Sequence, residues 1–325
     1  VALHSGFPYY AAVMAETILA GQDVELSVVI PCLNEDDTIA ECLTKAFEAF
    51  RKHDIRGEVI VADNGSTDDS VAIATRMGAR VVAVAEKGYG NALMGGIAAA
   101  RGRFIIMGDA DASYDFADIP AFLEKLRAGY DLVQGCRLPG GGGKVMPGAM
   151  PRLHEWIGNP LFSFLGRWWF HVPVHDVYCG LRGFRKTFYD RLDQRCTGME
   201  FATEMIIKAS LYKARIAEVP IVLHKDGRRS RRPHLKTFHD GWRTLRFFLM
   251  SSPRWLFYVP GMLMIVLGIL GYALALGNIP IRSIHFDAHT LLFASLALIM
   301  GYQSVLFAAF TKIFAINDHL LPPDP

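Results

Sequence analysis

The pattern of hydrophobic residues divides the chain into two parts. Across residues 25–223, short apolar runs alternate with stretches in which apolar residues recur at helical spacing. The runs predict strands at 26–30, 58–62, 80–84, 103–107 and 131–134. The helical stretches are 37–52, 68–77, 91–101 and 117–127. Because the strands are apolar on both faces and separated by helices, they predict an α/β fold with a mostly parallel sheet covered on both sides.

The C-terminal part holds two long uncharged runs, 255–277 and 290–311, joined by a polar loop at 278–289. Each run spans about one bilayer thickness in helical rise. Either run alone also fits the buried core helix of a soluble protein. Two such runs in tandem make that alternative weak, so we expect a transmembrane hairpin.

The charge distribution predicts the orientation of this hairpin. Eight basic residues against two acidic ones precede the first run, a net charge of +6, whereas the loop between the runs holds one arginine. Since positive charge stays on the cytoplasmic side, we expect the soluble domain and both chain ends to be cytoplasmic. The residues counted are Lys225, Arg228, Arg229, Arg231, Arg232, Lys236, Arg243 and Arg246 against Asp226 and Asp240.

Residues 234–252, just before the first run, carry an apolar stripe at helical spacing. Its members are Leu235, Phe238, Trp242, Leu245 and Leu249. This pattern predicts an amphipathic helix lying on the lipid leaflet, and the neighbouring apolar run favours that interpretation over a helix packed on the soluble domain.

Composition narrows the class of protein. Hydrophobic residues make up 51% of the chain, with the excess at the C-terminal end, and a net charge of +2 gives no broad nucleic-acid-binding surface. The five cysteines are odd in number and form no C-x-x-C pair, which indicates reduced thiols in a cytosolic compartment. The weakly apolar stretch 11–20 contains Glu16 and lacks a preceding basic segment, so we expect no secretory signal there.

Polar turns follow four successive predicted strands. Their notable residues are Pro31, Asn34 and Glu35, then Asp63 and Asn64, then Lys87, and finally Asp109 and Asp111. Each turn alone is unremarkable; Ser66 or Thr67, for example, fits an ordinary helix cap. Because ligands of parallel sheets bind beyond the carboxyl ends of the strands, the four turns together predict a nucleotide-sized crevice.

The pair Asp109 and Asp111 carries the most specific chemistry. Two carboxylates one residue apart can share Mg²⁺ or Mn²⁺, which prefers oxygen ligands and can neutralise a diphosphate. A solvated acidic turn is the alternative. A second alternative is a dinucleotide-binding turn, because Gly88, Gly90 and Gly95 open a helix and an acid follows about twenty residues later. A ribose clamp needs one carboxylate, so the doubled acid favours a metal–diphosphate site.

The ordered series of motifs resembles family-2 glycosyltransferases of the GT-A fold, specifically the polyprenyl-phosphate hexosyltransferases of the dolichyl-phosphate mannose synthase type. The resemblance covers residues 25–225. The matching segments are Ile30-Pro31-x-x-Asn34-Glu35, residues 63–68, Lys87-Gly88-x-Gly90, Asp109-Ala110-Asp111, Gly135-Cys136-Arg137, Asp176, Gly180-x-Arg182-x-Phe184 and residues 218–221.

The resemblance implies transfer of a hexose from a UDP-glucose or GDP-mannose type of donor to a polyprenyl phosphate such as undecaprenyl or dolichyl phosphate. It implies Mg²⁺ or Mn²⁺ at Asp109 and Asp111, with Arg137 as a further catalytic residue. It places the acceptor phosphate at Arg137 and Arg152. The implied nucleotide-sugar contacts are Pro31, Asn34, Glu35, Asp63, Asn64, Lys87, Asp109 and Ala110.

Two segments depart from the family pattern. Ser113 stands where some relatives have a glutamine, so one metal ligand would be water. The segment Cys179-Gly180-Leu181-Arg182 differs from the relatives' Ser/Asn-Gly-Phe-Arg, so the residues that form the sugar pocket are not assigned from this motif.

The expected acceptor determines what chemistry the site needs. A phosphate monoester, with its second pKa at about 6, is already mostly a dianion, so it needs positioning and charge compensation rather than a base. Attack from the face opposite the leaving group would invert the anomeric centre. The glycine-rich stretch 139–144 is expected either as a mobile rim of the acceptor site or as a plain surface loop.

Further candidates for a lid or the sugar pocket are Asp176, Arg182, Glu200, Glu204, Arg228 and Arg229. Glu200 and Glu204, one helical turn apart, fit a base for a sugar hydroxyl, but a structural or sugar-positioning role is favoured. Arg228 and Arg229 would close over the diphosphate or contact lipid headgroups.

Two other functions remain as alternatives. A processive polysaccharide synthase would carry Gln-x-x-Arg-Trp. The corresponding segment here ends in Arg254-Trp255 but has Ser251 in place of the glutamine. A non-catalytic, membrane-tethered nucleotide-sugar-binding protein has no reason to keep both aspartates.

The expected organisation is an unassigned segment at 1–24, a GT-A catalytic domain at 25–233, an interfacial helix at 234–252, a transmembrane hairpin at 253–318 and a tail at 319–325. Expected partners are the donor, the lipid acceptor and the bilayer, with no nucleic acid; self-association stays open.

Overall fold

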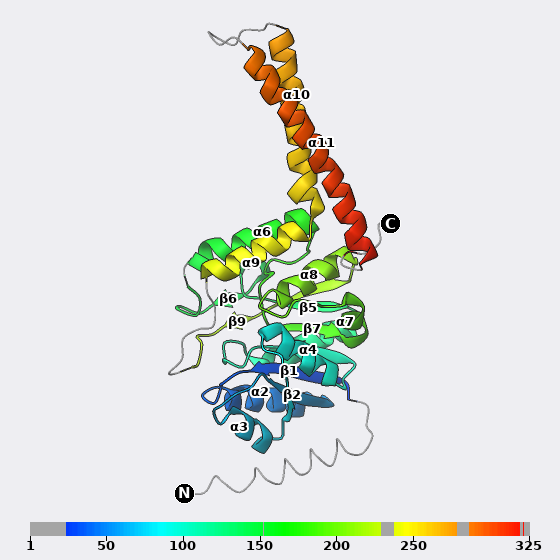
Figure 1. Ribbon diagram of the computed structural model, residues 1–325. Coiled ribbons are helices and arrows are strands. Elements are labelled where there is room, and N and C mark those ends of the chain that lie inside the picture. Colours follow the sequence, from blue (N-terminus) through cyan, green and yellow to red (C-terminus); the bar gives the residue numbers. More distant parts are fainter. Residues whose placement is uncertain (1–23, 152, 229–236, 278–285, 319–320, 322–325) are drawn as a thin grey trace, which may run out of the picture. The chain divides into compact units, whose positions relative to one another are not determined.

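The computed structural model describes residues 24–151, 153–228, 237–277, 286–318 and 321 (Figure 1). The segments 1–23 and 229–236 therefore lie outside the described residues. The chain forms two compact units, Val1–Gly241 and Trp242–Pro325, which are described separately.

The first unit is built on a seven-stranded sheet with the order β3-β2-β1-β4-β7-β5-β8. Strands β3, β2, β1 and β4 are parallel neighbours, β8 is parallel to β5, and β7 is antiparallel to both β4 and β5. The bounds are β1 Leu26–Cys32, β2 Gly57–Asp63, β3 Arg80–Ala83, β4 Phe104–Met107, β5 Leu132–Cys136, β7 Arg182–Arg185 and β8 Ile216–Pro220. The short strands β6 (Lys144–Val145) and β9 (Val222–Leu223) pair separately.

Helices cover both faces of the sheet. On one face α2 buries Ile39, Leu43 and Phe50 in the cluster that also holds Val28 and Ile30 of β1. On the other face α4 approaches closely, because a Cβ added at Gly96 would lie 2.6 Å from a methyl carbon of Val29. The helices are α2 Ile39–Lys52, α3 Ser70–Arg76, α4 Tyr89–Ala99, α5 Ile119–Arg127, α6 Asn159–Phe170, α7 Lys186–Leu192 and α8 Phe201–Leu211, with short turns η1 Phe116–Asp118, η2 Pro139–Gly141 and η3 His154–Gly158.

The sequence predicts five of the seven strands of this sheet. They appear as β1 to β5, and the mostly parallel arrangement is confirmed. Strands β8 and β7 were not expected; the sequence of β7, Arg-Gly-Phe-Arg, is not an apolar run. Strand β7 inserts antiparallel between β4 and β5, so the strand that neighbours β4 on that side comes from a segment beyond residue 180.

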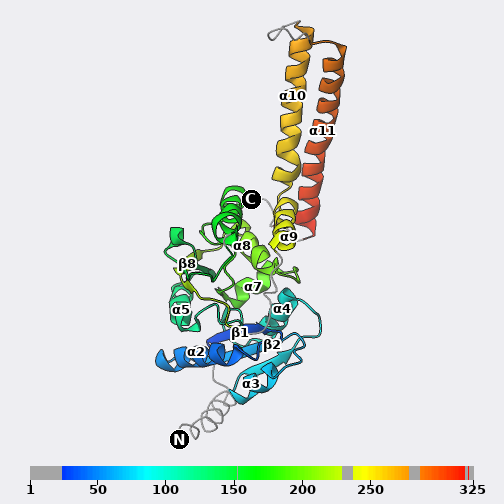
Figure 2. The same cartoon turned by 90° about the vertical axis from the view of Figure 1, so that its left-hand side faces the viewer.

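The second unit contains two long apolar helices that run side by side (Figure 2). Residues Arg254–Leu276 and Ala288–Asn317 have mean hydropathies of 2.2 and 1.9 and are long and apolar enough to cross a membrane. Only 11% and 17% of their most apolar windows are buried, which disfavours core helices of a soluble domain. The elements are η4 Arg254–Tyr258, α10 Val259–Leu276 and α11 Ala288–Asn317; α9 (Thr237–Met250) precedes them across the boundary of the units.

Glycines bring α10 and α11 into close contact. A Cβ added at Gly301 would lie 2.7 Å from the carbonyl oxygen of Gly261, and one at Gly268 would lie 2.8 Å from that of Ala294. Small residues at such crossings let two backbones approach, as is common between helices in lipid.

Glu58 ties several elements of the sheet together. Its side chain is 3% exposed and accepts hydrogen bonds from Ser27 Oγ (2.7 Å), Arg101 N (2.8 Å) and Arg80 Nη2 (2.8 Å). One buried carboxylate therefore links β1, β2, β3 and the turn after α4.

We expect Glu58→Ala to lower the free energy of unfolding by about 2 kcal/mol, and with it the thermal unfolding midpoint, because it leaves a buried hydroxyl and a backbone N–H without their acceptor. Unfolding in detergent measures the effect. Glu48→Ala, on the exposed face of α2, is the matched control and should change little. Equal midpoints for the two variants would contradict the linking role.

Candidate active site

The four polar turns meet at one edge of the sheet. Because β1 to β4 are parallel neighbours, their carboxyl ends lie together. Asn34 N donates to Ser66 Oγ (2.9 Å), which joins the first turn to the second. Gly88 N donates to Asn64 Oδ1 (2.8 Å), which joins the third to the second. The structure thus brings together the turns that the sequence predicts at the site.

Asp63, Asn64 and Lys87 form a tight frame at this edge. Asp63 accepts hydrogen bonds from the backbone N–H groups of Gly65 (3.1 Å) and Ser66 (3.0 Å). Asn64 Nδ2 donates to the carbonyl of Glu86 (2.7 Å), and Lys87 Nζ donates to the carbonyl of Asn64 (2.5 Å). In this frame Asn64 and Lys87 hold the turns in place.

Gly65 is required in that frame. It has φ of 90°, and a Cβ added there would lie 2.1 Å from Lys87 Nζ. A side chain at this position would be strained and would displace the lysine.

Asp109 lies at the end of β4 and is held by a tyrosine. Tyr89 OH, from the first residue of α4, donates to Asp109 Oδ1 (2.8 Å). Burial and the nearby charge of Asp111 raise the pKa of Asp109 to about 6. Sequence reasoning missed Tyr89; the available signal was a hydroxyl-bearing residue at the helix start, between Gly88 and Gly90.

The start of α4 packs against the backbone of another segment. The N–H groups of Gly90 and Asn91 donate to the carbonyl of Thr197 (2.9 and 3.3 Å). A Cβ added at Gly90 would lie 2.3 Å from the carbonyl oxygen of Cys196. The helix start that a pyrophosphate would occupy is therefore filled by the chain itself, which disfavours the dinucleotide-binding alternative.

Arg228 reaches the carboxylates at this edge. Its Nε lies 2.9 Å from Glu35 Oε2, its Nη2 lies 3.4 Å from Asp111 Oδ2, and its side chain is 9% exposed. The segment leading to it runs along the aspartate turn, since Gly227 N donates to the carbonyl of Asp111 (2.9 Å). Burial, opposed by Arg228, raises the pKa of Glu35 to about 7. The structure therefore places Arg228 beside Glu35 and Asp111.

The donor atoms at Asp109 and Asp111 fit a hard divalent cation. They offer only oxygens, and their crowding favours a positive charge between them. Among the residues that the structure describes, no group of three or more His, Cys, Asp or Glu side chains is placed to hold a metal. Mg²⁺ commonly takes one or two carboxylates together with water and substrate phosphates, so the pair would suffice as its protein ligands.

Arg137, a candidate for the acceptor phosphate, forms an ion pair within the domain. Its Nε and Nη2 lie 2.7 and 2.9 Å from the two carboxylate oxygens of Asp176. Asp176 is fully buried, so it is an ion-pair partner rather than part of an open sugar pocket. Against the effect of burial, the Arg137 guanidinium holds the pKa of Asp176 below its usual value.

Arg182 and Glu204 also make structural contacts. Arg182 is fully buried and donates to the carbonyls of Cys179 (2.9 Å), Val177 (2.8 Å) and Ala202. Glu204 pairs with Lys208 (2.7 Å) and accepts from the N–H of Cys196 (2.8 Å), the neighbour of Thr197. These contacts fit the structural role that the sequence favours for Glu204. Glu200 occupies the N-cap position of α8 without a capping hydrogen bond from its side chain, and Arg152 and Arg229 lie outside the described residues.

We expect Asp176→Asn to cost about 3–5 kcal/mol of stability, because it leaves the Arg137 charge buried without its partner. Thermal unfolding measures the loss. The control is Asp193→Asn, which removes the carboxylate from the exposed pair Arg195–Asp193 (2.7 Å) and should cost about 0–1 kcal/mol. A similar small cost at both positions would show that the Arg137–Asp176 pair does not support the fold.

Comparisons with known proteins place the chain among glycosyltransferases. Residues 27–193 match the model of glycosyl transferase family 2. The low-salt glycan biosynthesis hexosyltransferase Agl6 of Haloferax volcanii is 39% identical over 289 residues, which cover 89% of this chain and 68% of that protein. The dolichyl-phosphate hexose transferase of the same organism is 33% identical over 198 residues, covering 61% and 82%.

The fold has solved counterparts. Glucosyl-3-phosphoglycerate synthase from Mycobacterium tuberculosis, crystallised with Mn²⁺, UDP and glucosyl-3-phosphoglycerate, superposes with a TM-score of 0.54 at 24% identity, covering 77% of this chain and 86% of that one. The sheet order, the family match and the hexosyltransferase relatives together identify the chain as a member of glycosyltransferase family 2, with the GT-A fold.

Proposed function

We propose that this glycosyltransferase moves a hexose from a nucleotide-diphosphate sugar to a polyprenyl phosphate at the cytoplasmic face of a membrane. The observation that carries the proposal is the pair Asp109 and Asp111 at the carboxyl-end edge of the sheet, with Arg228 against it. The relative named as a dolichyl-phosphate hexose transferase supports the lipid acceptor.

The donor would lie across the turns after β1 to β4. Asp63 and the Asn64–Lys87 frame present a rigid wall for the nucleoside, and Arg228 brings a positive charge to the diphosphate end. Pro31, Asn34, Glu35 and Ala110 complete this wall in the proposal. Mg²⁺ or Mn²⁺ held by Asp109 and Asp111 would stabilise the negative charge that develops on the departing nucleoside diphosphate.

The acceptor explains why no base is needed. A phosphate monoester is mostly a dianion at neutral pH, so its oxygen attacks without losing a proton. Consistent with this, Glu204 is paired with Lys208. The chain's task is to hold the phosphate on the face opposite the leaving group, which inverts the anomeric centre.

The membrane part of the proposal rests on α10 and α11 and on the basic segment before them. The two helices are long enough to cross a bilayer, and the excess of basic residues precedes the first of them in the sequence. This arrangement would keep the domain beside the leaflet that contains the lipid acceptor.

The proposal is tested with purified protein, undecaprenyl phosphate, a panel of radiolabelled nucleotide sugars and Mg²⁺ or Mn²⁺. We expect label in the organic phase with one donor, and loss of that label with a chelator. Asp111→Asn should abolish transfer, whereas Asp190→Asn, an exposed control, should not. Label in an insoluble polymer would instead indicate a synthase, and full transfer by Asp111→Asn would overturn the metal assignment.

Arg228→Gln should lower kcat by about 10- to 100-fold, because a charge-assisted hydrogen bond to the diphosphate is lost. The protein should still sediment with membranes. Arg76→Gln, an exposed arginine on α3, is the control. Detachment from membranes with unchanged kcat would assign Arg228 to lipid headgroups instead.

A further inference from the structure

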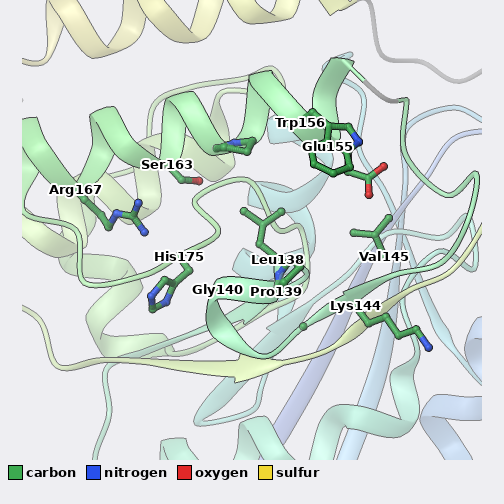
Figure 3. A pocket seen from close by; sticks show the side chains of 12 residues that line it. Leu138, Pro139, Gly140, Lys144, Val145, Glu155, Trp156, Ser163, Arg167 and His175 are labelled. Atoms are coloured by element: carbon green, nitrogen blue, oxygen red, sulfur yellow. The ribbon is translucent and has the colours of Figure 1, made fainter.

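Polar side chains that face open space in the first unit have room for water beside them. Glu155, Arg167 and His175 line a cavity of about 470 Å³ whose wall includes the glycine-rich stretch 139–144, and this cavity is large enough to hold water (Figure 3). A polar side chain that faces lipid has no water to bind, so it needs a partner from protein. Gln303 on α11 is a side chain of this second kind.

Gln303 lies inside the uncharged run of α11 and is exposed. The nearest charged residue on this helix is Lys312, nine residues further on. Nine residues of α-helix correspond to about 13 Å, which is farther than a glutamine side chain extends. In a membrane, the amide of Gln303 would therefore lie among lipid chains.

Other polar groups of the two long helices have partners inside the hairpin. Tyr272 OH and Ser295 Oγ lie 2.6 Å apart, and Ser304 Oγ donates to the carbonyl of Phe257 (2.8 Å). Among the residues that the structure describes, none forms a hydrogen bond with the Gln303 amide. An amide left unpaired in lipid costs free energy, so a partner from outside the hairpin is required.

Gln303 belongs to the face of α11 that points away from α10. The side that α11 buries consists of small residues spaced seven apart, namely Ala294, Gly301, Ala308 and Ala315. Gly301 is in close contact with α10, as described above. Gln303 follows Gly301 by two residues, and at 3.6 residues per turn this places it on the opposite side of the helix.

The outward face of α11 carries a second repeat, in which spacings of three and four residues alternate. Gln303 occupies one position of this repeat, and the other positions hold large apolar side chains that are 46% to 68% exposed. They are Phe293, Leu296, Met300, Phe307, Phe310 and Phe314. Alternating spacings of three and four allow two helices to pack along a left-handed seam, and one polar side chain in such a seam fixes the register of the partners.

From this geometry we infer that α11 pairs in the bilayer with α11 of a second copy of this chain, and that the two Gln303 side chains hydrogen-bond to each other. An amide offers both an acceptor oxygen and donor N–H groups, so two amides related by a two-fold axis can each donate to the other. Two copies inserted in the same orientation have parallel α11 helices, which brings equal positions of the repeat together. This inference rests on the proposed transmembrane hairpin and does not depend on sugar transfer.

The experiment uses full-length protein labelled with donor or acceptor fluorophores and reconstituted in liposomes at several protein-to-lipid ratios. Energy transfer between copies measures association. We expect Gln303→Leu to weaken association about 3- to 30-fold, the range for hydrogen bonds between membrane helices, and Gln303→Asn to retain part of it. Leu296→Ala on the outward face of α11 should also weaken association, whereas Leu263→Ala, an exposed leucine of α10, should not.

Disulfide formation tests the geometry of the pair. We expect Gln303→Cys to cross-link two copies on oxidation, because equal positions of a close parallel pair lie within disulfide distance. Ile269→Cys, on an exposed face of α10, is the matched control and should cross-link much less. The wild-type protein gives the background from its own cysteines.

Three outcomes would each overturn the inference: a monomer at every protein-to-lipid ratio, association unchanged by Gln303→Leu, or equal cross-linking at positions 303 and 269. Extraction of membranes with alkaline carbonate separates the two levels of the argument. Protein released by carbonate would refute the transmembrane hairpin itself. Protein that is retained but monomeric would refute only the pairing, and sugar transfer by that monomer would leave the proposed function standing.

Discussion

Repulsion between two carboxylates in an enclosed place is the constraint on which the site depends. Asp109 and Asp111 lie at the end of β4, and burial together with the nearby charge of Asp111 raises the pKa of Asp109. Positive charge must therefore be present at this edge of the sheet. Arg228, more than 100 residues beyond Asp111 in the sequence, contributes one such charge. The same guanidinium also pairs with Glu35. The Arg228 side chain therefore joins three segments: the turn that contains Asp111, the turn that contains Glu35 and the segment after β9.

The strands and helices near the N-terminus were predictable because each is a local pattern. Apolar runs gave β1 to β5, and the order of motifs gave the family. Strand β7 could not be predicted from hydrophobicity, because half of its residues are arginines. Arg182 donates hydrogen bonds to buried backbone carbonyls, and the local sequence does not indicate these contacts. The two apolar helices were predictable from length alone, although α11 begins and ends beyond the uncharged run.

The candidate site was predictable in its location and less so in its contacts. Parallel strands place their carboxyl ends together, so the meeting of the four turns followed from the fold class. Partners that are distant in the sequence did not follow. The local sequence does not indicate that Tyr89 donates a hydrogen bond to Asp109 or that Asp176 pairs with the guanidinium of Arg137. A charged residue's type shows what it can bind, whereas its neighbours in the fold decide what it does bind.

The carbonyl of Thr197 seated on the first turn of α4 has a consequence for how this domain can vary. Glu204 fixes the adjoining Cys196, Thr197 fixes the start of α4, and that start carries Tyr89 to the metal-binding aspartate proposed here. A substitution of Glu204 in α8 would thus alter the position of Asp109, nearly a hundred residues earlier in the sequence. Most of the contacts between the two involve main-chain atoms. Helix α8 thus helps to position a carboxylate whose proposed chemistry α8 itself does not perform.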